Sequence, residues 1–161
     1  MRAIPTIYSS SWIRYNFDFC TYGESMKKLF GWSLLALTMT ANAVPEIPDA
    51  RINDIAITTM LNGQVVIVFN PIVCQQIGPL VCNFFRAHEY GHVNLGHVVR
   101  PRHPRQAEFE ADCWAAQNAP LQEVQAAYAH FLANGFMGSW AHGTGVERAQ
   151  RLAACSRGRL R

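Results

Sequence analysis

The chain has 161 residues, of which 14 are lysine or arginine and 11 are aspartate or glutamate, for a formal net charge of +3. This length suggests one domain. The locally basic stretch 100–105 is broken by prolines and has no interleaved aromatic residues, so we expect a surface loop there and no role in nucleic-acid binding.

Residues 26–43 have the order of a secretory signal peptide. Two lysines lie at its start, an apolar stretch of 11 residues follows at 29–39, and Ala41-Asn42-Ala43 matches the A-x-A cleavage box. The apolar stretch is too short for a stable membrane span. We expect residues 1–25 to be a misassigned N-terminal extension and residues 44–161 to form a single exported domain, periplasmic or secreted. An uncleaved signal anchor is the alternative.

Two short apolar stretches, Ile55–Met60 and Gln64–Phe69, are typical of β-strands. Asn62-Gly63 between them predicts a tight hairpin turn. The following Asn70-Pro71 is expected to end the second strand and begin a loop.

The sequence His88-Glu89-Tyr90-Gly91-His92 is an H-E-x-x-H motif inside a predicted helix that Gly78-Pro79 opens and Gly96 caps. Positions i and i+4 share one face of a helix, so both imidazoles can bind one Zn²⁺ ion while Glu89 acts on a water as general base. The alternative is a pair of ordinary core histidines, because both fall on the same inward stripe as Val81, Phe84, Phe85 and Leu95.

A third zinc ligand is expected downstream, on a second helix that Pro104 opens. His97 misses a third-ligand spacing by one residue and is read as a surface histidine or as a partner of a ligand. Glu108 can complete a His₂Glu site, and Asp112, one turn later, can accept the free ring N–H of a ligand histidine. Glu110 is expected to point elsewhere. The alternative for all three acids is an acidic first turn that complements the helix dipole.

These two segments, His88-Glu89-x-x-His92 and Glu108-x-x-Ala111-Asp112, resemble the gluzincin metallopeptidases. The likeness is greatest to the family of the CAAX prenyl endopeptidases and the membrane peptidase HtpX. That family carries a His-Pro followed by Glu-Arg on a late helix. Here His142 precedes Glu147-Arg148 at the same spacing, with Gly143 in place of the proline. The resemblance covers roughly residues 65–155 and is closest to the minimal soluble members.

The resemblance implies a hydrolytic zinc site with His88, His92 and Glu108 as ligands and Glu89 as base. It also implies that His142 lies near the substrate oxyanion, and we expect His142 or Arg148 to stabilise that charge. In zincins an extended substrate typically pairs with an edge strand above the metal, so one of the predicted strands could serve that role. Alternatively, the strands only cover one side of a helical core.

Four cysteines follow the cleavage box, an even number that suggests two disulfides in an oxidising compartment. Three pairings are possible, and we expect Cys74–Cys82 and Cys113–Cys155. A cysteine zinc site is the rival interpretation, and the lack of any C-x₂-C spacing disfavours it.

The C-terminal part is predicted to hold two more helices. The first spans Leu121–Asn134 between Pro120 and Gly135, and the second runs to about Cys155 behind a Thr144-x-x-Glu147 capping box. The glycine-rich loop between them carries large apolar side chains that either line a substrate pocket or form a plain lid: Phe136, Met137 and Trp140.

The sequence therefore predicts an α+β fold, a minimal zincin-like domain with a helical core, an H-E-x-x-H helix and a small β-hairpin or sheet edge. The expected function is a zinc-dependent endopeptidase with Zn²⁺ as cofactor and a peptide or protein substrate. We expect no stable membrane span after signal cleavage, and the oligomeric state stays open. The alternatives are a non-catalytic zinc-binding module and a disulfide-stabilised secreted interaction protein.

Overall fold

The computed structural model of this chain describes residues 43–100 and 102–160, so the expected extension 1–25 and all but the last residue of the expected signal peptide lie outside the described residues. The described part is α+β, as the sequence predicts. Its strands are β1 (Glu46–Pro48), β2 (Ala56–Leu61), β3 (Gln64–Phe69), β4 (Gly138–Ser139) and β5 (Gly143–Thr144). Its helices are α1 (Pro71–Ile77), α2 (Pro79–Asn94), α3 (Pro104–Asn118), α4 (Leu121–Asn134) and α5 (Gly145–Cys155).

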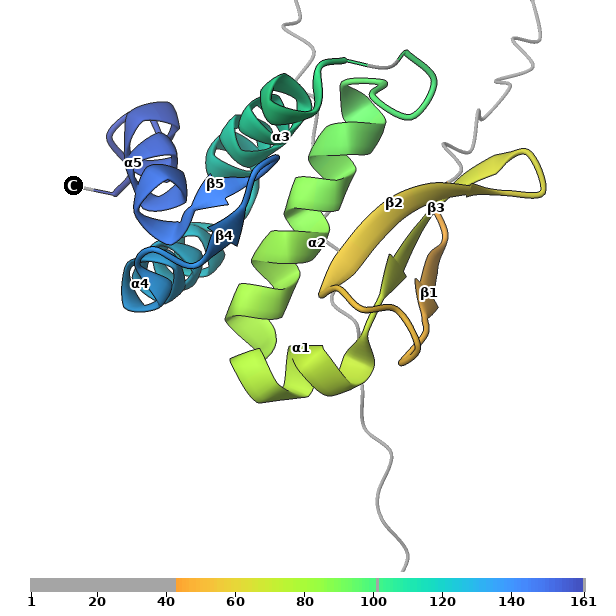
Figure 1. Cartoon of the computed structure of the whole chain (residues 1–161), viewed down its shortest axis with the longest axis horizontal. Coiled ribbons are helices and arrows are strands. Elements are labelled where there is room, and N and C mark those ends of the chain that lie inside the picture. Colours follow the sequence, from red (N-terminus) through yellow and green to blue (C-terminus); the bar gives the residue numbers. More distant parts are fainter. Residues whose placement is uncertain (1–42, 101, 161) are drawn as a thin grey trace, which may run out of the picture. The chain divides into compact units, whose positions relative to one another are not determined.

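The predicted hairpin is confirmed. Strands β2 and β3 pair antiparallel around Asn62-Gly63, where both residues have positive φ (50° and 78°), the backbone that a tight hairpin turn needs. The short β1, which the sequence did not reveal, pairs parallel to β3 on its other side. The order β1-β3-β2 makes β2 the outer strand. Figure 1 shows this sheet on one side of α2, with α3, α4 and α5 on the other.

The segment after β3 corrects one expectation, because Asn70-Pro71 begins a helix and not a loop. The side-chain oxygen of Asn70 accepts hydrogen bonds from the backbone N–H groups of Ile72 and Val73, and Pro71 occupies the first helical position. This helix, α1, has only seven residues and none of them is buried, so the sequence shows no apolar periodicity that would predict it. Cys74 therefore lies on a helix.

The core is built from side chains of α2, α3, α4 and α5, with α2 packed against α3 and α4, and α5 packed against α3 and α4. Phe84 is fully buried, and its ring meets the ring of Phe131 edge to face at 6.0 Å. Small residues line α3 where it meets α2, and Ala111, Ala115 and Ala116 are all fully buried. Gly91 completes this close crossing, since a Cβ there would lie 3.0 Å from the Cα of Ala111.

Both expected disulfides are present. Cys74–Cys82 joins α1 to α2, and Cys113–Cys155 joins α3 to α5. Each bond therefore ties one of the helices that carry the candidate site, α2 and α3, to a neighbouring helix. None of the helices in the described residues is long and apolar enough to cross a membrane.

Candidate metal centre

The two histidines of the H-E-x-x-H motif point the same ring nitrogen toward a common point. His88 and His92 are one helical turn apart on α2, and their Nε2 atoms lie 3.1 Å from each other. His88 is almost completely buried, whereas His92 keeps about an eighth of its side chain exposed (12%). The pair therefore presents two Nε2 atoms at the edge of the core, within reach of solvent.

Glu108 of α3 brings a third possible metal-ligand atom to the same point. Its Oε2 lies 3.0 Å from Nε2 of His88 and 3.5 Å from Nε2 of His92. Three ligands held about 2.0–2.2 Å from one Zn²⁺ in a tetrahedron stand roughly 3.3–3.5 Å apart, so the three observed separations come close to that triangle. Burial alone would raise the pKa of Glu108, but hydrogen bonds from His142, His88 and His92 outweigh it and hold the carboxylate ionised.

Asp112 fixes the orientation of His88 from behind. This fully buried carboxylate lies 2.8 Å from Nδ1 of His88, so Nδ1–H donates to it and Nε2 is the ring nitrogen that faces the cluster and can bind a metal once it is deprotonated. Burial raises the pKa of Asp112, but Arg148 and His88 outweigh that effect and the pKa lies below its usual range. Asp112 thus remains an anion at the back of the site.

Arg148 lies behind Asp112. Its Nε and Nη2 atoms donate to the two oxygens of Asp112 at 3.1 and 2.6 Å, and Arg151 donates to the same carboxylate at 2.7 Å. The Arg148 guanidinium also covers the ring of Phe131 at 4.3 Å. The structure therefore gives Arg148 a partner that the sequence did not suggest, and this contact makes it a positioning residue for Asp112.

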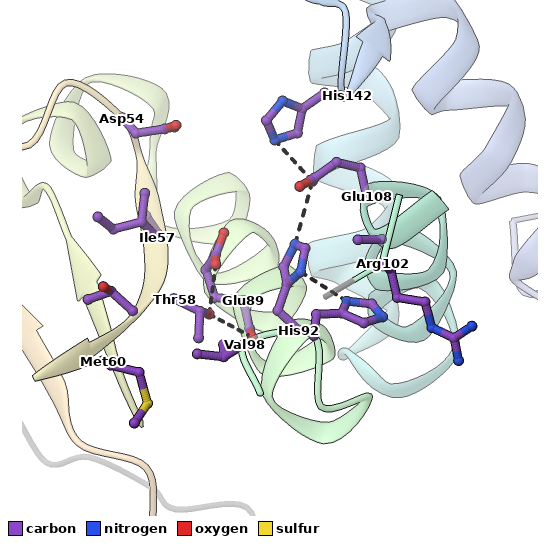
Figure 2. Close-up of a pocket in the computed structure, with 14 residues that line it drawn as sticks. Asp54, Ile57, Thr58, Met60, Glu89, His92, Val98, Arg102, Glu108 and His142 are labelled. Carbon is purple, nitrogen blue, oxygen red and sulfur yellow. Dashed lines mark hydrogen bonds and ion pairs between the residues drawn. The ribbon is translucent and has the colours of Figure 1, made fainter. Parts of the chain in front are cut away.

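Glu89 lies beside the two histidines and faces the sheet. One ligand atom each of His88, Glu89 and His92 lie within 4.8 Å of one another. The hydroxyl of Thr58 on β2 approaches to 2.8 Å from Oε2 of Glu89 and 3.0 Å from its backbone carbonyl (Figure 2). Burial raises the pKa of Glu89 despite the opposing effect of the nearby imidazoles. Thr58 looked like an ordinary strand residue in the sequence, and only the packing of β2 on α2 reveals its contact with Glu89.

His142 reaches the cluster from the opposite side, on the turn between β4 and β5. Its Nε2 lies 3.0 Å from Oε2 of Glu108 (Figure 2). The backbone N–H of His142 donates to the hydroxyl of Ser139 at 3.1 Å, and this hydroxyl lies 2.8 Å from Nδ1 of the same imidazole. The Ser139 hydroxyl accepts a hydrogen bond from the backbone of His142, so its own proton can be donated to Nδ1 of the His142 ring. The imidazole proton of His142 is then on Nε2, which faces the cluster.

His97 and Glu110 lie together beside the cluster, and their contacts decide between the two interpretations of His97. His97 is buried (9%) and its two ring nitrogens lie 3.0 Å from His92 and 3.0 Å from Glu110. It is therefore a partner of a candidate ligand and not a surface residue. Glu110 supplies no ligand atom to the cluster. Its carboxylate still lies close to the site, because it contacts His97.

An open cavity of about 550 Å³ leads to this cluster. Five consecutive residues of β2 (56–60) line one wall, and Glu89, His92, Glu108 and His142 line the other (Figure 2). Because consecutive strand residues point to opposite faces of a sheet, such a wall means that the edge of β2 borders the cavity. A second cavity of about 280 Å³ shares Glu89 and His142 with the first and includes Met137 in its lining.

No protein-family model, no curated protein and no solved structure matches this chain.

Proposed function

We propose that this chain is a zinc-dependent endopeptidase with a minimal zincin-like domain, related in its site to the gluzincins that the sequence motifs resemble. One observation carries the proposal. Two imidazole nitrogens and one carboxylate oxygen stand at separations of 3.0, 3.1 and 3.5 Å at the end of an open cavity, a donor set and spacing suited to a catalytic Zn²⁺ with a free fourth position.

The ligands and the base have separate tasks. His88, His92 and Glu108 would hold the metal, and a bound Zn²⁺ would supply a Lewis acid for the scissile carbonyl and a water whose pKa is lowered toward about 7. Glu89 takes the proton from the attacking water and passes it to the leaving amine. The Thr58 hydroxyl orients the Glu89 carboxylate. Burial raises the pKa of Glu89, which makes it a stronger base than an exposed glutamate.

His142 stabilises the developing oxyanion. Its Nε2–H points toward the cluster, and Ser139 fixes that proton by binding Nδ1. The same Nε2 lies 3.0 Å from Oε2 of Glu108, so the N–H is turned toward the place where a substrate carbonyl would sit. Arg148 acts one step further back, through Asp112 and His88.

The proposed substrate is an extended peptide or protein segment. β2 is the outer strand of its sheet and its edge borders the cavity, so a peptide can pair with it and bring a carbonyl toward Glu89 and His142 on the opposite wall. No role with nucleic acid is proposed. The two disulfides, together with the predicted signal peptide, support an oxidising compartment, periplasmic or extracellular.

A non-catalytic zinc-binding module is the second candidate, and the surface beside His142 favours it. Phe136, Met137 and Trp140 are 90%, 73% and 65% exposed, and exposed apolar groups of this kind suit a binding role. A catalytic base such as Glu89 is not needed in a module of that type.

The test starts from the protein expressed from Met26 and exported to a bacterial periplasm. We expect about one Zn²⁺ per chain, lost in the His88→Ala/His92→Ala variant, and cleavage of a broad peptide library that a chelator abolishes. Full zinc occupancy in that double variant would refute the metal centre. One zinc per chain without any cleavage would favour the binding module.

A further inference from the structure

The end of α2 turns His97 back over His92. Gly96 has φ +71°, and its N–H donates to the carbonyl of Val93 at 3.0 Å, while the N–H of His97 donates to the carbonyl of His92 at 3.0 Å. This pair of bonds defines a Schellman motif, in which the second residue past the helix cap contacts the residue in the last turn whose carbonyl it binds. The backbone alone therefore brings the two side chains together.

The two imidazoles meet through their Nδ1 atoms, and a carboxylate completes the chain. Nδ1 of His97 lies 3.0 Å from Nδ1 of His92, and Nε2 of His97 lies 3.0 Å from Oε2 of Glu110. Only 4% of the His97 side chain is exposed. Glu110 is held in place by the amide of Gln106, which donates to its other oxygen at 2.8 Å, and by Arg102 at 3.8 Å.

A metal on His92 would set each proton along this chain. A ligand Nε2 carries no proton, so the imidazole proton of His92 sits on Nδ1 and is donated to His97. Nδ1 of His97 must then be the bare acceptor, because two N–H groups cannot form one hydrogen bond. The His97 proton consequently sits on Nε2 and is donated to the Glu110 carboxylate.

We infer that His97 and Glu110 form a relay that orients His92 and increases its basicity as a ligand, an inference that rests on the proposed metal centre. The two histidine ligands are then supported in different ways. His88 donates directly to the buried anion Asp112, whereas His92 donates through a neutral imidazole to a carboxylate near the surface. Losing such a partner typically costs about 10–100-fold in metal affinity or activity.

The test measures zinc affinity and not catalysis. Zinc-stripped, exported protein is titrated against a chromophoric chelator, with His97→Leu, His97→Asn and Glu110→Gln as variants. Leucine keeps the packing over His92 but accepts no hydrogen bond, so affinity should fall about 10–100-fold. Asparagine places its oxygen near the position of Nδ1, so it should recover part of the loss. His103→Leu is the matched control, because His103 is exposed and has no ring contact with the cluster.

Nitrogen-15 NMR of the zinc-loaded wild type gives a second readout that does not require any variant to fold. His97 should carry its proton on Nε2 alone, and His92 on Nδ1 alone. Wild-type affinity in folded His97→Leu, or a proton on Nδ1 of His97, would overturn the relay while leaving the metal centre intact. A wild type that takes up no zinc would instead refute the metal centre, and the relay with it.

Discussion

Gly91 and Ala111 meet where α2 crosses α3, and a Cβ on Gly91 would lie only 3.0 Å from both the Cα and the carbonyl oxygen of Ala111. The glycine lies one residue before His92, and the alanine lies one turn after Glu108 on the same helix face. The close backbone approach is therefore what brings a carboxylate of one helix to the histidines of the other.

Gly91→Ala should separate the two helices and weaken zinc binding. An alanine in a helix interior normally stabilises by about 1 kcal/mol over glycine. Here it forces backbone apart, and overpacking of this kind costs about 1–3 kcal/mol. We expect lower stability in urea denaturation together with weaker zinc affinity. Asn94→Ala, at an exposed position of α2, is the control and should leave zinc affinity unchanged. A more stable Gly91→Ala protein with unchanged zinc affinity would contradict the proposed role of this crossing.

Asp112→Asn should harm both stability and metal binding. The change leaves Arg148 and Arg151 without their shared anion, and breaking a buried ion pair from one side costs about 3–5 kcal/mol. It also removes the charge that supports His88, so zinc affinity should fall about 10–100-fold. Denaturant titration and chelator competition measure the two effects. Asp54→Asn, an exposed carboxylate at the cavity rim, should change neither.

Zinc affinity should rise with pH. Burial alone would lower the pKa of His88, but Asp112 and Glu108 outweigh it and raise the pKa to about 9. Zinc binds the neutral imidazole, so below that pKa a proton must leave as the metal enters, and affinity gains up to about tenfold per pH unit. Calorimetry at neutral pH in two buffers of different ionisation enthalpy should show this proton release. The range from pH 6 to 8 lies below this pKa of about 9. Zinc affinity that stays flat across that range would mean that His88 is already neutral there.

His142→Ala should lower turnover with little change in zinc content. If its N–H binds the oxyanion, losing that donor costs about 10²–10³-fold in turnover. Ser139→Ala should give a smaller loss of the same kind, because the imidazole proton is then no longer held on Nε2. Trp140→Ala, on the same turn but with its ring against His103, is the comparison. Equal activity in wild type and His142→Ala would reduce His142 to a turn residue.

Local signals account for the parts of the fold that the sequence predicted. The Asn62-Gly63 turn, the proline and glycine at the ends of α2 and the capping box of α5 each act within a few residues. The short helix α1 was not predicted because it buries no residue, and β1 was not predicted because three residues are too few to show a periodic pattern.

The candidate site divides in the same way. His88, Glu89 and His92 are readable from helical spacing alone, and Glu108 and Asp112 from a second helix face. Thr58, Ser139 and Arg148 act through contacts 3 to 36 residues distant in the chain, which spacing on one element cannot reveal. His97 is an intermediate case. It follows the capping Gly96 and lies five positions after His92, which is the spacing of the contact in a Schellman motif and can be recognised in the sequence.

The most direct test of the central claim compares the wild type with Glu89→Gln on the same peptide substrate at equal zinc content. Glu89 holds no metal in this account, so the variant should keep its fold and one Zn²⁺ per chain. The amide cannot accept the water proton, so cleavage should fall about 10²–10⁴-fold. Loss of zinc in Glu89→Gln, or cleavage at the wild-type rate with full zinc, would contradict the assignment of Glu89 as the base of a zinc peptidase.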